Sequence, residues 1–194
     1  MRYYSDNGVD QSVELLLPDF GYAVDIGANN GNFNSNTLAL EEKGWLVLCV
    51  EPNPLLAEEG RKIRQLWREV ACGALDEDLR KFYAYGTHPF ASGSALYPPK
   101  PGYVSAEDVD KPLNQHLVLV RTLNRLLEES GFPRVDFVTI DVEGYENEVL
   151  AGFDLGVWKP TVLCVESLNN DLETPKGYKL LERRMFDNVY VRDE

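Results

Sequence analysis

The stretch Val24-Asp25-Ile26-Gly27-Ala28-Asn29-Asn30-Gly31, followed downstream by Glu51-Pro52-Asn53-Pro54, decides the fold of this chain. It predicts a buried strand, a glycine-bearing loop, a helix and a second strand that ends in a carboxylate. In an open α/β sheet, ligands bind beyond the carboxyl ends of the strands, where the strand order reverses. Gly27 and Gly31 allow the backbone to turn tightly and to approach a ligand that a Cβ atom would exclude. We therefore expect a ligand site at the end of the first strand.

The second part of this stretch indicates which ligand is bound. Glu51 lies 20 residues beyond Gly31 (51 − 31), at the end of the apolar run from Leu46 to Val50. A carboxylate at this place can accept hydrogen bonds from both hydroxyls of a ribose. The adenosine part of a cofactor is therefore the expected ligand.

The spacing of the glycines distinguishes between adenosine cofactors. NAD and FAD require G-x-G-x-x-G, but Asn29 and Asn32 occupy the second and third glycine positions here. A Walker loop would have a Lys-Ser/Thr pair after its glycines, where this chain has Asn32-Phe33. The remaining pattern, Asp25-x-Gly27-x-x-x-Gly31, resembles motif I of the class I S-adenosylmethionine-dependent methyltransferases. The alternative is a glycine turn in an α/β domain that binds no cofactor.

The composition is ordinary for a soluble globular protein and indicates one domain covering residues 1–194. The chain has a mass of 22.0 kDa, with 44% hydrophobic and 26% charged residues, a formal net charge of −13 and a pI near 4.6. This negative charge disfavours nucleic acid and anionic membranes as partners, because both attract basic residues. The three cysteines lack CxxC or histidine partners, and the first residues carry no signal-peptide core. We therefore expect a cytoplasmic protein.

Apolar periodicity predicts a doubly wound α/β architecture. Strands are predicted at 22–25, 45–51, 69–72, 81–85, 117–120, 136–141 and 161–166, and helices at 34–43, 54–66, 122–130 and 146–151. Their alternation implies a mostly parallel, Rossmann-like sheet. Segments 178–181 and 189–191 predict an antiparallel pair at its C-terminal edge. The proline- and glycine-rich segment from about 86 to 115 is interpreted as a lid or substrate-recognition loop.

Acidic residues gather where strands end. Carboxylates follow the apolar runs at Asp25, Glu51, Asp141 and Glu166, and parallel strands bring such ends to one rim of the sheet. Glu143 lies two residues after Asp141, so in an extended segment both side chains would point the same way. Each acid also has a structural interpretation, such as bonding the glycine loop or favouring a helix N-terminus. Core packing does not explain four of them together.

The sequence resembles the FkbM-type methyltransferases along nearly its whole length. The most specific block is Ile140-Asp141-Val142-Glu143-Gly144-Tyr145-Glu146. Further matching positions are Tyr4-Ser5, Gly8, Asp10, Ser35-Asn36-Thr37-Leu38, Gly44-Trp45, Val118-x-Val120-Arg121-Thr122-Leu123, Val165-Glu166 and Asp187-Asn188-Val189-Tyr190-Val191. The resemblance implies a class I methyltransferase fold and methyl transfer from S-adenosylmethionine, often to a hydroxyl oxygen of a sugar, glycan or natural product. It implies cofactor contacts from Asp25, Gly27, Ala28, Asn29, Asn30, Gly31, Asn36, Glu51, Pro52, Cys72, Gly73 and Asp141.

Methyl transfer to an alcohol requires alignment of the reactants and removal of the hydroxyl proton by a base or with a metal. Asp141 is the first candidate for the base, Glu143 would support it, and His88 in the long loop is a further candidate. Asp141, Glu143 and Glu166 would form an all-oxygen set suited to Mg²⁺, although the sequence does not require a metal. The expected acceptor is a small molecule or a carbohydrate. A small-molecule N-methyltransferase and a catalytically silent binding domain remain alternatives.

Overall fold

The computed structural model describes residues 2–84, 95–96, 114–168 and 172–193. The helices among them are α1 (Val9–Glu14), α2 (Leu38–Glu42), α3 (Pro54–Ile63), α4 (Leu123–Ser130), α5 (Glu146–Ala151) and α6 (Leu155–Trp158). The strands are β1 (Tyr22–Ile26), β2 (Leu46–Val50), β3 (Leu66–Arg68), β4 (Ala71–Cys72), β5 (Glu77–Ala84), β6 (Ala95–Leu96), β7 (Asn114–Arg121), β8 (Phe137–Ile140), β9 (Val162–Glu166), β10 (Tyr178–Arg184) and β11 (Asp187–Arg192).

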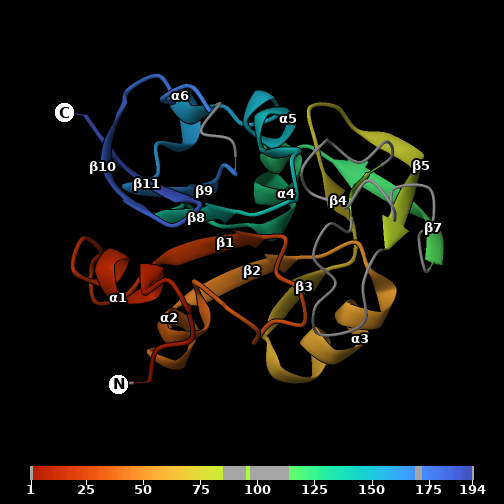
Figure 1. Ribbon diagram of the computed structural model, residues 1–194, viewed down its shortest axis with the longest axis horizontal. Coiled ribbons are helices and arrows are strands. Elements are labelled where there is room, and N and C mark those ends of the chain that lie inside the picture. Colours follow the sequence, from red (N-terminus) through yellow and green to blue (C-terminus); the bar gives the residue numbers. More distant parts are fainter. Residues whose placement is uncertain (1, 85–94, 97–113, 169–171, 194) are drawn as a thin grey trace.

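The main sheet confirms the predicted α/β fold class. Its strand order in the described residues is β10-β11-β9-β8-β1-β2-β3 (Figure 1). Neighbours from β9 to β3 are parallel, whereas β11 is antiparallel to both β9 and β10. The predicted antiparallel pair at the C-terminal edge is therefore present. The chain runs outward from β1 to β3 and returns on the other side of β1 as β8. The strand order thus reverses between β1 and β8, which is where ligands bind in such sheets.

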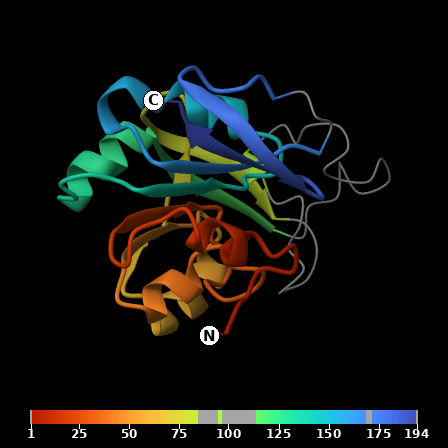
Figure 2. The ribbon, with the colours of Figure 1, turned by 90° about the vertical axis from the view of Figure 1, so that its left-hand side faces the viewer.

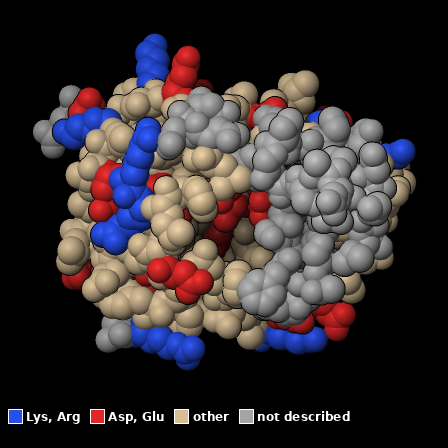
Figure 3. Space-filling model, viewed as in Figure 1, with Lys and Arg blue, Asp and Glu red and all other residues tan. Residues whose placement is uncertain are grey.

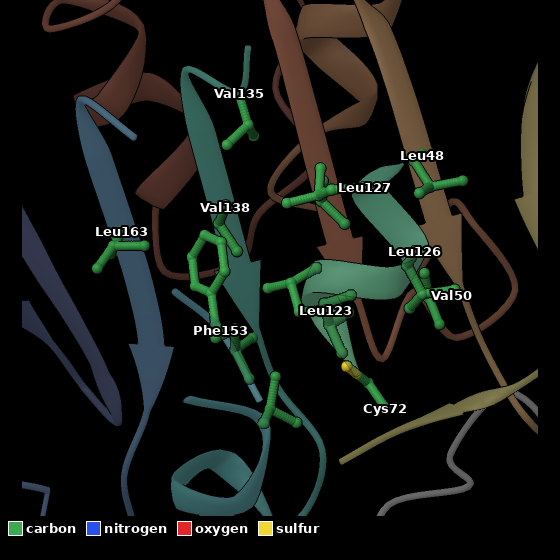
Figure 4. Packing of buried hydrophobic residues seen from close by; sticks show 14 of the residues in the cluster. Leu48, Val50, Cys72, Leu123, Leu126, Leu127, Val135, Val138, Phe153 and Leu163 are labelled. Carbon is green, nitrogen blue, oxygen red and sulfur yellow. The ribbon is translucent and has the colours of Figure 1, made fainter. Parts of the chain in front are cut away.

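Helices cover both faces of the main sheet. On one face, the leucines of α4 point toward the neighbouring strands (Figure 4) and pack with Val138 of β8 and Leu163 of β9. On the other face, Val13 of α1 and Leu40 of α2 pack with Val47 of β2. The sheet is therefore buried on both sides, which explains why its parallel strands are continuous apolar runs in the sequence. None of the helices that the structure describes has the length and apolar character needed to cross a bilayer.

Some of the predicted strands belong to a second, smaller sheet. Its order is β4-β7-β5-β6 in the described residues, and β5 and β7 form its antiparallel centre (Figure 1). Of the predicted strand at 69–72, only Ala71–Cys72 is a strand, β4, and it joins the small sheet. The strand β3 just before it was not predicted and joins the main sheet. Most of the predicted loop at 86–115 lies outside the described residues. Within its bounds, β6 pairs with β5, and the first two residues of β7 are already strand.

The helix predicted at 34–43 begins only at Leu38. Asn34 has a φ of 48°, which a right-handed helix excludes. The Ser35 hydroxyl accepts hydrogen bonds from the backbone N–H groups of Thr37 and Leu38 at 3.3 and 3.1 Å. Such side chain–backbone bonds compete with the helical pattern. The chain therefore passes from Gly31 to α2 through an irregular segment. The short helices α1 and α6 were not predicted, because six and four residues give too little periodicity.

Candidate functional site

A cavity of about 270 Å³ opens beside the reversal of strand order, at the carboxyl ends of β1, β2, β8 and β9. Its charged lining residues in the described structure are all carboxylic acids: Asp25, Glu51, Asp141, Glu143 and Glu166. Acidic side chains are visible inside a hollow near the middle of the face shown in Figure 3. The described lining thus offers no cation to an anionic ligand, and its acids, once ionised, favour a neutral or cationic one.

The glycine loop joins three strand ends at the cavity. Gly27 has a φ of +84°, and its N–H group donates to the Val50 carbonyl at 2.9 Å. The N–H group of Asp141 donates to the Ile26 carbonyl at 2.9 Å. A Cβ atom on Gly27 would lie 1.7 Å from the backbone oxygen of Asp141. Glycine is therefore required here by the close approach of the β1 and β8 ends to each other.

Glu51 follows β2 and presents a buried carboxyl group to the cavity. Its Oε1 accepts a hydrogen bond from the N–H of Asn53 at 2.8 Å, and its Oε2 accepts one from the N–H of Asn29 at 3.2 Å. Burial raises the pKa of Glu51 to about 8, against the opposing effect of these two bonds. Each carboxylate oxygen has lone pairs left for a ligand hydroxyl.

Asp25 in β1 holds the irregular segment that precedes α2. Its Oδ2 accepts hydrogen bonds from the hydroxyls of Thr37 at 2.6 Å and Ser35 at 3.5 Å. Burial raises the pKa of Asp25, and the nearby positive charge of Arg64 opposes that rise. Because Asp25 and Ser35 both line the cavity, these bonds shape its wall.

A group of three carboxyls gathers around the ends of β8 and β9, next to the glycine loop. Asp141, Glu146 and Glu166 each offer an oxygen within 4.8 Å of the others. Burial raises the pKa of Asp141 well above its ordinary value, and the charge of Glu166 raises it further. The pKa of Glu166 is raised to about 8. Burial is the largest cause, and the charges of Glu143 and Glu146 contribute next. Like charges this close retain a proton at neutral pH, so one member can accept or donate one.

Glu143, expected beside Asp141 in a metal-binding group, lies outside this group although it lines the cavity. The expectation assumed an extended backbone, but Glu143 and Gly144 have φ values of 56° and 96°. The chain therefore turns sharply after Asp141. Glu146 stabilises this turn, because its Oε1 accepts hydrogen bonds from the N–H groups of Val142 at 3.1 Å and Gly144 at 3.0 Å. The turn brings Glu146 back beside Asp141 in place of Glu143.

Comparison with protein families now adds to this geometry. The model of the methyltransferase FkbM domain matches residues 25–190, which span the glycine loop, all five lining acids and the edge strands. The chain belongs to the FkbM methyltransferase family. It is thus an S-adenosylmethionine-dependent methyltransferase. Comparison with curated protein sequences gave no match. Among solved structures, a TehB-like SAM-dependent methyltransferase from Corynebacterium glutamicum is similar at 9% identity and a TM-score of 0.47, covering 96% of this chain and 88% of that one.

The cavity of this methyltransferase brings together most of the residues expected at its cofactor site. Those that line it are Asp25, Gly27, Ala28, Asn29, Asn36, Glu51, Pro52, Cys72 and Asp141. Asn30, Gly31 and Gly73 do not line it. Of the three catalytic candidates, Asp141 and Glu143 line the cavity, whereas His88 lies outside the described residues. Glu166 lines it as well.

Several lining residues were not expected from the sequence. Phe82 and Leu96 come from the small sheet, and Tyr145 lies in the turn before α5. Thr139 of β8 accepts a hydrogen bond from the Asn36 side chain at 3.0 Å. Tyr145 could have been found within the specific block from 140 to 146. Phe82 and Leu96 had no signal, because their place depends on how the small sheet packs against the main one.

The cavity fits S-adenosylmethionine better than a dinucleotide. Glu51 can hold the ribose hydroxyls, and Leu56, Val70 and Cys72 offer an apolar wall for the adenine. A dinucleotide would place its pyrophosphate on the N-terminus of a helix that opens directly from the glycine loop. Here α2 begins only at Leu38, eleven residues beyond Gly27 (38 − 27). The acidic lining also disfavours a pyrophosphate, whereas it suits the positive sulfonium.

Proposed function

We propose that this methyltransferase transfers the methyl group of S-adenosylmethionine to a hydroxyl oxygen of a carbohydrate or other small acceptor. The observation that carries this proposal is the position of two acidic sites in one cavity. Glu51 lines it on the side of β2, and Asp141 and Glu166 line it on the side of β8 and β9, with Glu146 next to them outside the lining. The first suits the ribose of the cofactor, and the second suits an acceptor that must lose a proton.

When bound, the cofactor supplies an electrophilic methyl group on a positively charged sulfur. Glu51 and the backbone around Gly27 bind and orient the adenosyl part. Asp141 would accept the proton of the acceptor hydroxyl, directly or with Glu166, as the oxygen–carbon bond forms, the carbon–sulfur bond breaks and S-adenosylhomocysteine leaves. The raised pKa values of this pair suit the role, because a base works best when its pKa lies near the working pH.

The remaining lining supports a neutral acceptor. Phe82, Leu96 and Tyr145 offer an apolar and aromatic wall, on which a sugar ring or a flat natural product can stack. The described lining has no lysine or arginine to bind a phosphorylated acceptor or a nucleic acid, and its acids repel both once they ionise. The same charge attracts an ammonium group, and for this reason an amine acceptor is the second candidate.

Incubation with S-adenosylmethionine that carries a trideuterated methyl group is expected to label acceptors through oxygen. The assay compares neutral glycosides and phenols with their amine-bearing counterparts, and fragment masses assign the label to oxygen or nitrogen. Labelled amines alone would replace this proposal by N-methylation. Calorimetric binding of S-adenosylhomocysteine without transfer to any hydroxyl or amine would favour a silent binding domain.

The three-carboxyl group also has the all-oxygen character that Mg²⁺ prefers, so the same assay includes a metal test. Asp141, Glu146 and Glu166 would hold the ion, which would polarise the acceptor oxygen. Loss of transfer on addition of EDTA, with recovery on addition of Mg²⁺, would assign the group to metal binding. Unchanged transfer in EDTA would rule out a metal in the reaction and leave proton transfer as the proposed role of the group.

Substitution Glu51→Gln is expected to weaken binding of S-adenosylhomocysteine by roughly 10- to 150-fold, because ribose hydroxyls would lose a charged acceptor worth about 1.5–3 kcal/mol. Below a pH of about 8, Glu51 of the unliganded protein holds a proton that ribose donors must displace. The affinity of the wild type should therefore rise with pH until about 8 and then level off. Calorimetry between pH 6 and 9 measures both effects, and the variant should show no such rise.

Unfolding provides an independent check on Glu51. Folding raises its pKa from 4.5 to about 8, so its contribution to the stability of the unliganded protein is complete below 4.5 and lost as the pH rises to about 8. Urea unfolding of the wild type should therefore lose more stability across this range than that of Glu51→Gln. Identical slopes for the two proteins would contradict the raised pKa.

A further inference from the structure

Arg64 is a buried cation beneath the cofactor site that the proposed function does not use. It follows α3 directly, and its side chain has no exposed surface. A buried guanidinium is costly unless its N–H groups are bonded, and well-packed apolar residues often replace such ion pairs without loss of stability. Its bonds therefore indicate what it does in this protein.

The planar guanidinium joins two segments of the chain that lie far apart in the sequence. Its Nε donates to Glu41 of α2, and its Nη1 donates to the carbonyl of Gly31 at 2.8 Å and to the Ser35 hydroxyl at 3.3 Å. Its Nη2 donates to the Thr37 hydroxyl at 2.7 Å. One side chain thus connects the end of α3 with the glycine loop, the segment after it, and α2. Both helices lie in the lower half of the two ribbon views (Figure 1, Figure 2).

The second glycine of the motif is explained by its positive φ of +79° together with the close approach of Arg64. Gly31 does not line the cavity, so a ligand does not require its missing side chain. A Cβ atom there would lie 2.7 Å from Cγ of Arg64 and 3.2 Å from the ring of Trp67. Gly31 therefore leaves room for Arg64 beneath the loop. In the D-x-G-x-x-x-G pattern, the first glycine, Gly27, allows the close approach of the β1 and β8 ends at the cavity, and the second, Gly31, leaves space for Arg64.

Arg64 also acts on Asp25 through Thr37. Because the Thr37 hydroxyl accepts a bond from Arg64, its own proton is directed to Oδ2 of Asp25 at 2.6 Å. Nη1 of Arg64 lies 3.9 Å from the same oxygen. Both interactions favour the charged form of Asp25 in a site where burial opposes it.

We propose that Arg64 is a positioning residue, which holds the glycine loop and Asp25 in the arrangement that binds S-adenosylmethionine. The inference rests on the proposed cofactor site. Arg64 does not touch the cavity, so it acts on the cofactor only through Gly31, Ser35, Thr37 and Asp25.

The test must separate positioning from folding, because Arg64→Met alone leaves Glu41 as a buried, unpaired charge. The double variant Glu41→Gln/Arg64→Met removes both charges, and the glutamine keeps an oxygen for the N–H of Gln65, which Glu41 binds at 2.8 Å. Glu41→Gln alone keeps Arg64. Arg61→Met, at an exposed arginine one turn earlier in α3, is the matched control. Each protein is measured for its melting temperature, its Kd for S-adenosylhomocysteine, and its KM and kcat in methyl transfer.

The double variant is expected to melt near the wild type and yet to bind S-adenosylhomocysteine roughly 10- to 100-fold more weakly, because hydrogen bonds from a charged donor are lost. Its KM for the cofactor should rise similarly, while kcat at saturating cofactor changes little. Glu41→Gln and Arg61→Met should bind like the wild type. A double variant with wild-type Kd and KM would overturn the proposal and leave Arg64 a purely structural residue.

If neither Arg64→Met nor the double variant folds, Arg64→Lys is measured in their place. Lysine keeps the charge but lacks the planar fork that reaches Gly31 and Thr37 together. A raised Kd at a near-normal melting temperature supports the proposal, and a wild-type Kd overturns it. A wild type that binds neither adenosyl ligand would instead overturn the proposed cofactor site, and this inference with it.

Discussion

Asp141→Asn is expected to lower kcat by roughly 10²- to 10⁴-fold, the usual range for loss of a general base. The substitution preserves the shape of the side chain and removes its charge and basicity. Asp141 lies at the end of β8, beside the glycine loop and within the three-carboxyl group. In its proposed role, its interaction with the acceptor proton develops in the transition state, so kcat and kcat/KM for the acceptor should fall together. The Kd for S-adenosylhomocysteine should change far less.

Calorimetry and steady-state rates on the same preparation check this division of roles. Asp78→Asn is the matched control, because that side chain is 93% exposed and lies outside the cavity. It should behave like the wild type in both measurements. A variant of Asp141 with near-normal turnover but lost cofactor binding would move Asp141 to the cofactor side of the site.

The pH dependence of turnover follows from the same group. A base must be ionised to accept a proton, and burial raises the pKa of Asp141 above its usual range and that of Glu166 to about 8. The wild-type kcat should therefore rise through neutral pH and level off above about 8. This rise reports the pair rather than one residue. It should be altered in Asp141→Asn and retained in Asp78→Asn.

The fold was predictable because its decisive signals are local. Buried parallel strands are apolar runs, and the glycines and helix ends between them mark the turns. The sequence did not predict that the small sheet is separate from the main one, because the strand pattern of β4, β5 and β7 is the same whichever sheet they join. The late start of α2 depends on the bonds of Ser35 and on the left-handed conformation of Asn34. Such bonds are not visible in apolar periodicity.

The part of the candidate site that lies at the ends of parallel strands was predictable from the sequence. Asp25, Glu51, Asp141 and Glu166 were expected at one rim, and all four line one cavity. The exchange of Glu143 for Glu146 could not be foreseen, since it depends on a turn with two consecutive positive φ angles. Arg64 had no sequence signal either. Its partners lie 23 to 33 positions away in the chain and meet only after α2 and α3 have packed.

Gly27→Ala should cause the largest loss of stability, more than about 4 kcal/mol. Two effects add: the new Cβ atom would overlap a buried backbone group, and alanine disfavours the positive φ of this position. Its new Cβ would lie 1.7 Å from the oxygen and 2.8 Å from the carbon of the Asp141 carbonyl. A backbone group cannot swing away as a flexible side chain can, so the ends of β1 and β8 must separate. That separation would also move Asp141 away from the glycine loop, and binding of S-adenosylhomocysteine should be lost.

The matched control is Gly44→Ala. Gly44 also has a positive φ, +97°, but a Cβ atom there would meet nothing within 4 Å. It should therefore lose only the backbone preference, about 1–3 kcal/mol, and keep cofactor binding. Urea unfolding and calorimetry on both variants isolate the contact with Asp141 from the cost of the positive φ. Equal stability losses in the two variants would show that the contact relaxes freely. Retained binding in a folded Gly27→Ala protein would show that the cofactor site does not depend on the close approach of β1 and β8.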